Sequence, residues 1–174
     1  MLKKLVPDEY VKSIYDIDIN ALKSRGFKGI ITDLDNTLVG AKEPYATPQL
    51  LDWLTNLKNM GFQVVIVSNN NRLRVSRFAE PLILPYIHKA MKPINKAFHK
   101  ALGMMKLTPA DTVVIGDQML TDVLGGNRMG LYTILVSPVS LNDESFFTKI
   151  NRRVEKIVLA GWRKKGGVPW EERK

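Results

Sequence analysis

The sequence predicts an α/β fold, in which helices cover both faces of a parallel sheet of about five strands. Short apolar segments alternate with segments of helical periodicity from residue 28 to residue 136. The apolar segments are nearly continuous runs, which is typical of parallel strands buried on both faces. The 174 residues, 45% of them hydrophobic, suffice for one domain with a buried core. We expect that domain over residues 1–165, with its core at about 28–136 and a tail at 166–174.

The expected strands are apolar segments bounded by glycine, proline or polar residues. In chain order they cover residues 28–34, 62–67, 87–90, 112–115 and 131–136. The expected helices lie between them, at about 47–61, 72–79, 93–102 and 119–128. The first helix begins at Thr47-Pro48, an N-cap followed by proline, and ends at Gly61, a residue that favours the position after a helix.

The C-terminal segment predicts a basic amphipathic helix over about residues 143–163. Apolar residues recur at helical spacing from Phe147 to Trp162, while Lys149, Arg152 and Lys156 fall on the opposite arc. Three interpretations are open. The helix packs on the sheet with a solvated basic face, it lies at the surface of an anionic membrane, or it helps to pair two copies of the chain.

The chain is strongly basic, with 26 Lys+Arg against 17 Asp+Glu and a formal net charge of +9. A positive field attracts nucleic acid, an anionic membrane or a phosphorylated small molecule without choosing among them, and it also serves solubility alone. The absence of cysteine excludes disulfides and thiolate metal sites, and it suits a reducing compartment. The first residues lack the apolar core of a signal peptide, so we expect a cytoplasmic protein.

Polar residues follow four of the expected strands at their carboxyl ends, where reactive groups gather in parallel sheets. Each of them alone is ordinary turn chemistry. Together, in this order, they are expected to converge on one crevice. They are Asp33, Asp35 and Thr37 after the first strand, Ser68 and Asn69 after the second, Lys92 after the third, and Asp117 and Asp122 after the fourth.

These residue types suit the hydrolysis of a phosphate monoester, a dianion that repels an attacking carboxylate unless charge is neutralised. Mg²⁺ held by a few carboxylates neutralises it, together with a lysine and hydroxyl or backbone donors on the phosphoryl oxygens. A nucleophilic aspartate forms an acyl-phosphate and splits the displacement into two steps. A second carboxyl group protonates the leaving group and later activates water.

The segment Asp33-Leu34-Asp35-Asn36-Thr37 resembles the DxDxT first motif of haloacid dehalogenase (HAD) phosphatases. Ser68, Lys92-Pro93 and Gly116-Asp117 with Asp122 resemble their second, third and fourth motifs. The resemblance implies a Rossmann-like HAD fold, with Asp33 as nucleophile and Asp35 as general acid and base. It further implies that Mg²⁺ is held by Asp33, the backbone carbonyl of Asp35, Asp117 and Asp122, and that the phosphoryl group is bound by Ser68, Asn69 and Lys92.

The spacing of the motifs predicts that no cap domain is inserted. Asp35 and Ser68 are 33 residues apart and Ser68 and Lys92 are 24 apart, and the expected helices fill both gaps. An uncapped crevice stays open to bulky substrates, unless a small loop or a partner subunit serves as a lid.

Within the family, the chain resembles the small capless YqeG group, which is related to phosphatidylglycerophosphate phosphatases. The shared segments are Pro7-Asp8-Glu9-Tyr10, Ile17-Asp18-Ile19-Asn20 and Gly116-Asp117-Gln118. This resemblance implies a lipid phosphate substrate. Such a substrate and the basic C-terminal helix are both compatible with peripheral contact at the inner face of a membrane. Two alternatives stay open: a non-catalytic RNA- or ribosome-associated binding protein, and a phosphotransferase that passes the phosphoryl group to an acceptor other than water. The presence of both Asp33 and Asp35 argues against the non-catalytic binding protein but does not separate a phosphatase from a phosphotransferase; we favour the phosphatase.

Overall fold

Six parallel strands form one sheet in the computed structural model, which describes residues 2–140, 146–164 and 167–170. The order across the sheet is β1-β6-β5-β2-β3-β4. The prediction of a parallel α/β sheet is confirmed, with one strand more than the five expected. The strands are β1 (Glu9–Val11), β2 (Gly29–Thr32), β3 (Gln63–Val67), β4 (Tyr86–Ile87), β5 (Thr112–Gly116) and β6 (Tyr132–Val136).

The additional strand, β1, forms one edge of the sheet and pairs with β6. Its three residues are too few to show a periodic pattern in the sequence. Asp8, just before the strand, accepts hydrogen bonds from the Thr133 amide at 2.8 Å and the Thr133 hydroxyl at 3.0 Å. This side chain therefore contributes to the register that the backbone of β1 adopts.

The helices confirm the predicted alternation, with shifted boundaries. The helix expected from Pro93 begins three residues later, and the one expected at 119–128 is a π-helical turn, η5 (Met119–Val123), followed by α5. The α-helices are α1 (Ile19–Ser24), α2 (Pro48–Asn59), α3 (Arg72–Ala79), α4 (Lys96–Met105), α5 (Leu124–Met129) and α6 (Phe146–Lys164). Short 3₁₀ turns are η1 (Leu2–Leu5), η2 (Ile14–Asp16), η3 (Glu80–Leu82) and η4 (Pro109–Asp111).

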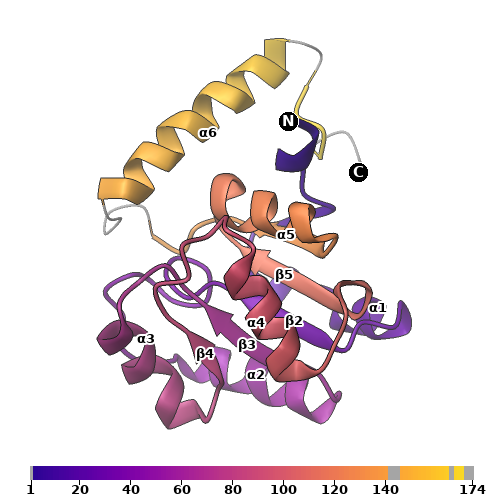
Figure 1. Ribbon diagram of the computed structural model, residues 1–174, viewed down its shortest axis with the longest axis vertical. Coiled ribbons are helices and arrows are strands. Elements are labelled where there is room, and N and C mark those ends of the chain that lie inside the picture. Colours follow the sequence, from indigo (N-terminus) through magenta and orange to yellow (C-terminus); the bar gives the residue numbers. More distant parts are fainter. Residues whose placement is uncertain (1, 141–145, 165–166, 171–174) are drawn as a thin grey trace.

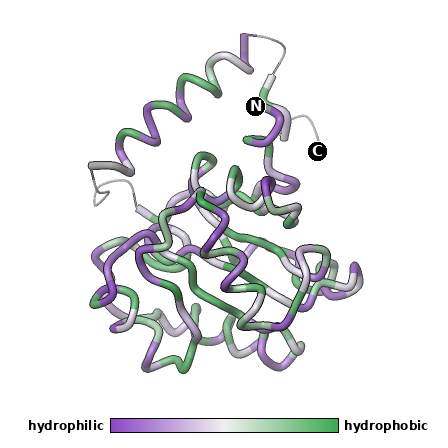
Figure 2. Tube along the Cα trace, in the orientation of Figure 1, coloured by the Kyte–Doolittle hydropathy of each residue, from purple (hydrophilic) through white to green (hydrophobic). Residues whose placement is uncertain are grey.

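Helices cover both faces of the sheet, as Figure 1 shows. Successive side chains of a strand point to opposite faces, so Val64 and Ile66 of β3 pack with α1, α2 and α3, while Val65 and Val67 pack with α4. The central strands are accordingly among the most hydrophobic segments of the trace in Figure 2. Both faces of the sheet are buried, which explains why the strands appear as continuous apolar runs.

A third apolar cluster joins α6 to the rest of the molecule. Met119 and Leu135 belong to it, and Val158 and Trp162 of α6 pack against them. Trp170 of the predicted tail also packs against this cluster, and Val168 beside it is 1% exposed. In Figure 1, α6 lies on the far side of η5 and α5 from the sheet. None of the helices in the described ranges is long and apolar enough to cross a bilayer.

Candidate active site

Three of the predicted site residues follow directly on the carboxyl ends of neighbouring strands. Asp33 comes after β2, Ser68 after β3 and Asp117 after β5. The last residue of β2 is level with Ile66 and Ile115 in the strands on either side, so the three strand ends lie side by side. The exposed fractions of the three residues are 7%, 2% and 2%. The sheet therefore brings them together along the line formed by the carboxyl ends of its strands, as the sequence predicts. This side of the sheet is called the carboxyl edge, and the opposite side, at the amino ends of the strands, is called the amino edge.

Asp33, Asp117 and Asp122 form a cluster of carboxylates with the geometry of a metal site. One carboxylate oxygen of each lies within 4.8 Å of those of the other two. Asp122 reaches the cluster from η5, and it lies so close to Gly116 that a Cβ there would collide with its carboxylate. Glycine at position 116 thus leaves the space that Asp122 fills. Oxygen ligands at this spacing suit Mg²⁺, which takes a few carboxylates together with water and substrate oxygens.

The charge balance of the cluster also favours a cation. Burial and the neighbouring carboxylate of Asp33 raise the pKa of Asp117 to about 8, although Arg152 opposes the shift. Burial likewise raises the pKa of Asp33 to about 6, although Lys92 opposes it. The raised pKa values mean that Lys92 and Arg152 do not fully offset the cost of burying these carboxylates. The residues present therefore fit a divalent cation, which would supply further positive charge.

Lys92 supplies positive charge within the cluster. Its Nζ lies 2.9 Å from Oδ1 of Asp33 and 2.7 Å from Oδ1 of Asp122, and the side chain is 2% exposed. Burial lowers the pKa of this ammonium group, but the carboxylates of Asp122 and Asp33 outweigh burial and raise the pKa above its ordinary value. Lys92 is therefore charged at neutral pH, where it can attract a phosphoryl group.

The side chain of Asn69 holds the backbone of Lys92 in place. Its Oδ1 accepts a hydrogen bond from the Lys92 amide at 2.7 Å, and its Nδ2 donates to the Lys92 carbonyl at 3.3 Å. The hydroxyl of Ser68 accepts from the Asn70 amide at 3.1 Å. Asn69 therefore links the loop after β3 to the loop that carries Lys92. Contact of Ser68 and Asn69 with a phosphoryl group stays a prediction.

Asp35, whose side chain is 18% exposed, is held by two residues outside the set predicted for the site. Nε and Nη2 of Arg74 each lie 2.9 Å from Oδ1 of Asp35, and Nδ2 of Asn70 donates to Oδ2 at 2.9 Å. Arg74 is in the first turn of α3, where Asn71 caps the helix by accepting from the Arg74 amide. The sequence offered one indication of this role, because Arg74 lies in the helix that directly follows the second predicted strand and its site residues.

Thr37 connects the first motif to the fourth. Its hydroxyl donates to Oδ1 of Asp117 at 3.0 Å. The loop makes this contact because Asn36 has a left-handed backbone, with φ at 65°, a conformation that asparagine adopts more readily than most residues. The amide of Asn36 donates to the carbonyl of Val39 at 2.7 Å and closes the turn.

Helix α6 adds two site residues that the sequence analysis missed. Arg152 donates hydrogen bonds to the carboxylate of Asp117 and to its backbone carbonyl. Oε2 of Glu155 lies 3.3 Å from Nη1 of Arg152. Oε1 of Glu155 accepts hydrogen bonds from the backbone amides of Met119, at 2.6 Å, and Leu120, at 3.2 Å. Burial raises the pKa of Glu155, although Arg152 and these amides oppose the shift. Arg152 was predicted on the solvated arc of the helix; in the structure this side chain reaches the carboxylate cluster.

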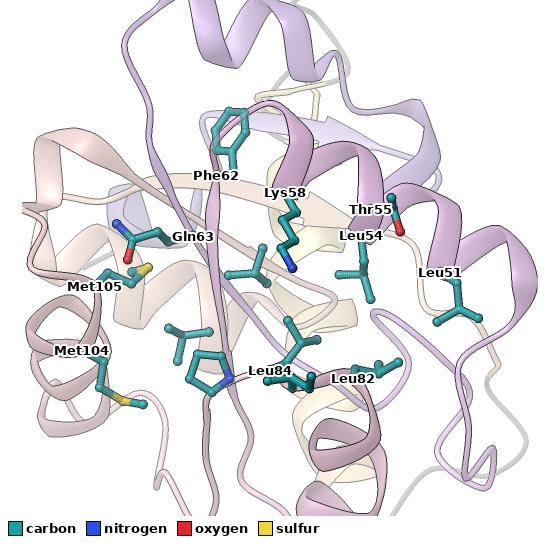
Figure 3. Close-up of a pocket in the computed structure, with 14 residues that line it drawn as sticks. Leu51, Leu54, Thr55, Lys58, Phe62, Gln63, Leu82, Leu84, Met104 and Met105 are labelled. Carbon is teal, nitrogen blue, oxygen red and sulfur yellow. The ribbon is translucent and has the colours of Figure 1, made fainter.

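The cavity drawn in Figure 3 is separate from this site. It has a volume of about 700 Å³ and is lined by apolar side chains such as Leu54, Leu82 and Leu84, with Lys58 among them. Gln63 also lines it, at the amino end of β3, whereas Ser68 follows the carboxyl end of the same strand. The cavity and the carboxylate cluster therefore lie at opposite edges of the sheet.

Comparisons with known proteins agree with the chemistry of the carboxyl edge. A family model described as HAD-hydrolase-like matches residues 90–139, and one described as mitochondrial PGP phosphatase matches residues 2–78. A solved structure, the cobalt-bound deoxy-D-mannose-octulosonate 8-phosphate phosphatase of Haemophilus influenzae, has the same fold, with a TM-score of 0.54 and 16% identity. The match covers 79% of this chain and 90% of that one. Together with the motifs at the strand ends, these matches agree with a phosphatase of the HAD superfamily, and a full-length relative establishes that class.

Two curated relatives narrow the assignment. The Bacillus subtilis protein described as probable phosphatase YqeG is 55% identical over 99% of this chain and 100% of its own length. The chain therefore belongs to the YqeG family of HAD phosphatases. Phosphatidylglycerophosphate phosphatase 1 of Arabidopsis thaliana is 31% identical over 95% of this chain, which spans 50% of that relative's length.

Proposed function

We propose that the protein is a magnesium-dependent phosphatase in which Asp33 forms an aspartyl-phosphate intermediate. The observation that carries the proposal is the position of the Asp33 carboxylate, 2.9 Å from the ammonium of Lys92 and within 4.8 Å of the carboxylates of Asp117 and Asp122. A carboxylate needs a cationic environment of this kind to approach a phosphate dianion.

The bound cation would be held by the carboxylates of Asp33, Asp117 and Asp122 and by the backbone carbonyl of Asp35. It would lower the charge on the phosphoryl oxygens and orient them. Lys92, Ser68 and Asn69 would bind the remaining phosphoryl oxygens, Lys92 as a fixed positive charge and the other two as hydrogen-bond donors.

The reaction would proceed in two displacements at phosphorus. In the first, a carboxylate oxygen of Asp33 attacks, the ester P–O bond breaks, and the carboxyl group of Asp35 gives its proton to the leaving oxygen. In the second, Asp35 accepts a proton from a water molecule as that water attacks phosphorus, which releases inorganic phosphate and restores Asp33. Arg74 and Asn70 would keep Asp35 oriented through both steps, since they hold its two oxygens.

For the substrate, we propose a lipid phosphate of the phosphatidylglycerophosphate type, hydrolysed at the cytoplasmic face of a membrane. The match of residues 2–78 to the PGP phosphatase model and the similarity to the Arabidopsis enzyme support this substrate. The chain between Asp35 and Ser68 consists of a loop, α2 and β3, and the chain between Ser68 and Lys92 consists of α3, η3 and β4. These short elements favour a crevice without an inserted cap, open to a bulky substrate.

Turnover of p-nitrophenyl phosphate tests the chemistry. We expect activity with Mg²⁺ and none with EDTA, and we expect Asp33→Asn to lower kcat by at least about a thousand-fold because the nucleophile is lost. Asp52→Asn, an identical change at an exposed position of α2, is the control and should behave as the parent protein. Activity that persists in Asp33→Asn would exclude the aspartyl-phosphate mechanism. For the substrate, vesicles containing phosphatidylglycerophosphate should be hydrolysed far better than sugar phosphates, and the reverse preference would exclude the lipid proposal.

A further inference from the structure

Helix α6 has two faces with different roles. The inner face packs on the molecule: Glu155 is 5% exposed, Arg152 is part of the site, and Val158 and Trp162 belong to an apolar cluster. Other residues of α6, among them Ile150, Val154 and Ile157, are exposed and form the outer face of the helix. The sequence analysis left the environment of this helix open between the sheet, a membrane surface and a second copy of the chain. The packing of the inner face accounts for that face alone.

The outer face of α6 carries an apolar stripe. Ile150, Val154 and Ile157 follow one another at spacings of four and three residues, which places them on one side of a helix. Their exposed fractions are 41%, 41% and 72%. Isolated exposed apolar residues are ordinary on protein surfaces, but an aligned set on one helix face is typical of an interaction surface.

Positive charge flanks this stripe. Lys149, Arg153, Lys156 and Lys164 are exposed, and at 100° per residue they fall on the arc next to Ile150 and Ile157. The single acidic residue of α6, Glu155, is buried against Arg152. The outer face of α6 therefore combines aliphatic side chains with positive charge only.

We propose that the outer face of α6 binds the surface of an anionic lipid bilayer, with Ile150, Val154 and Ile157 among the acyl chains and the flanking lysines and Arg153 at the lipid phosphates. Interfacial helices combine the same two features, an apolar face and neighbouring cations. A second copy of the chain fits less well, because a symmetric contact would bring positive charge against positive charge. RNA fits less well too, because aliphatic side chains in the middle of the surface offer no partner to phosphates or bases.

The outer face of α6 lies close enough to the carboxylate cluster to bring the active site to a membrane. This inference rests on the lipid substrate proposed above. Arg152 touches Asp117 from the inner face, and a helix with its side chains is roughly 10 Å across. The outer face thus lies about one helix diameter from the carboxylate cluster. Docking through this face would hold the crevice beside the headgroups of the same bilayer that contains the substrate.

Flotation with vesicles tests the surface without catalysis. The protein is mixed with vesicles of phosphatidylcholine alone or of phosphatidylcholine and phosphatidylglycerol in equal parts, and the bound fraction is measured at low and at physiological ionic strength. We expect binding only to the anionic vesicles, weakening with salt. Ile157→Asp should weaken it by about ten-fold or more, because a buried isoleucine contributes roughly that factor. Replacing Lys149, Arg153 and Lys156 together by Gln should weaken it by about a hundred-fold, at roughly five-fold for each charge.

Matched controls lie on other surfaces. Ile83→Asp changes an isoleucine that is 90% exposed, and Lys100→Gln changes an exposed lysine of α4; both should bind vesicles as the parent does. Ile157→Asp should keep its melting temperature and its turnover of p-nitrophenyl phosphate, since the side chain is exposed and outside the site. Equal binding by Ile157→Asp and the parent would overturn the proposal. So would a dimer that Ile157→Asp dissociates, or tighter binding to an RNA oligonucleotide than to anionic vesicles.

The outcome is separable from that of the proposed function. Asp33→Asn should bind anionic vesicles as the parent does. Vesicle binding without any phosphatase activity would refute the proposed function and support the surface, whereas turnover of p-nitrophenyl phosphate without vesicle binding would refute the surface alone.

Discussion

The two edges of the sheet differ in what they bury. At the carboxyl edge, Asp33, Lys92 and Asp122 are each no more than 7% exposed, and Lys92 contacts both carboxylates. At the amino edge, the cavity of about 700 Å³ is lined mainly by apolar side chains. Burial of charge costs several kcal/mol per ion unless it is compensated, so a fold keeps such a cluster for its chemistry. The comparison shows that buried charge marks the candidate active site of this protein, whereas a large apolar cavity lies at the other end of the strands.

The largest difference in activity and stability between the two edges should appear when one lysine is replaced at each, Lys92 at the carboxyl edge and Lys58 at the amino edge. Lys92→Met would leave two buried carboxylates without their ammonium, and we expect kcat/KM to fall by about a thousand-fold. The free energy of unfolding of the metal-free protein should fall by about 3–5 kcal/mol in denaturant titrations. Lys58→Met at the cavity is the matched control, with stability within about 0.5 kcal/mol and unchanged activity. A comparable loss of activity in both variants would remove the distinction.

Replacement of Arg152 should have a smaller effect at the carboxyl edge, on the pH dependence of magnesium binding. Its positive charge lowers the pKa of Asp117, so Arg152→Met should raise that pKa further and make protons compete better with Mg²⁺. We expect the pH at which magnesium binding is half complete to rise by about one unit, measured by calorimetric titration from pH 6 to pH 9. Arg153→Met, one residue along and on the outer face, should leave the curve unchanged. An unshifted curve for Arg152→Met would mean that α6 does not influence the cluster.

The pH dependence of stability provides a subtler measure of the same buried charge. The pKa values of Asp33 and Asp117 are raised to about 6 and about 8 from 3.8, so between about pH 4 and pH 8 the folded metal-free protein holds more protons than the unfolded chain. Its stability should therefore fall as pH rises through that window. Mg²⁺ should offset the loss, and the increase in melting temperature it causes should grow by a few degrees from pH 6 to pH 8. An increase that is constant with pH would show that the two carboxylates are not ligands.

The smallest effect is expected at the amino edge. Thr55 lines the cavity, and Thr55→Leu would partly fill it, with a change in the free energy of unfolding of about 1 kcal/mol or less. kcat and KM should both stay at the parent's values. A change in KM for the phosphate substrate would show instead that the cavity takes part in binding it.

Much of the carboxyl edge could be predicted from sequence because each residue there directly follows an element with a strong local pattern. The runs before Asp33, Ser68 and Asp117 are apolar throughout, and parallel strands of similar length end at the same level. Lys92 follows the very short β4, and the order of the motifs located it. The phosphate contacts and catalytic roles of these residues remain predictions.

The contribution of α6 could not be predicted, for a physical reason. Helical periodicity shows which residues share a face but not which face is buried, and here both faces carry apolar residues. Arg152 and Glu155 look like ordinary solvated charges until the backbone amides of η5 and the carboxylate of Asp117 are placed beside them. The strand β1 was missed because it is only three residues long and pairs with β6, more than a hundred residues away in the sequence.

The link between Glu155 and the amides of η5 has a consequence for biosynthesis. All four motifs precede residue 123, while Arg152 and Glu155 emerge from the ribosome well after them. During synthesis, the carboxylates of Asp33, Asp117 and Asp122 are therefore made before Arg152. The ion pair between Arg152 and Asp117 forms only when α6 docks. Enzymatic competence of a newly made molecule would then report on completion of its C-terminal part.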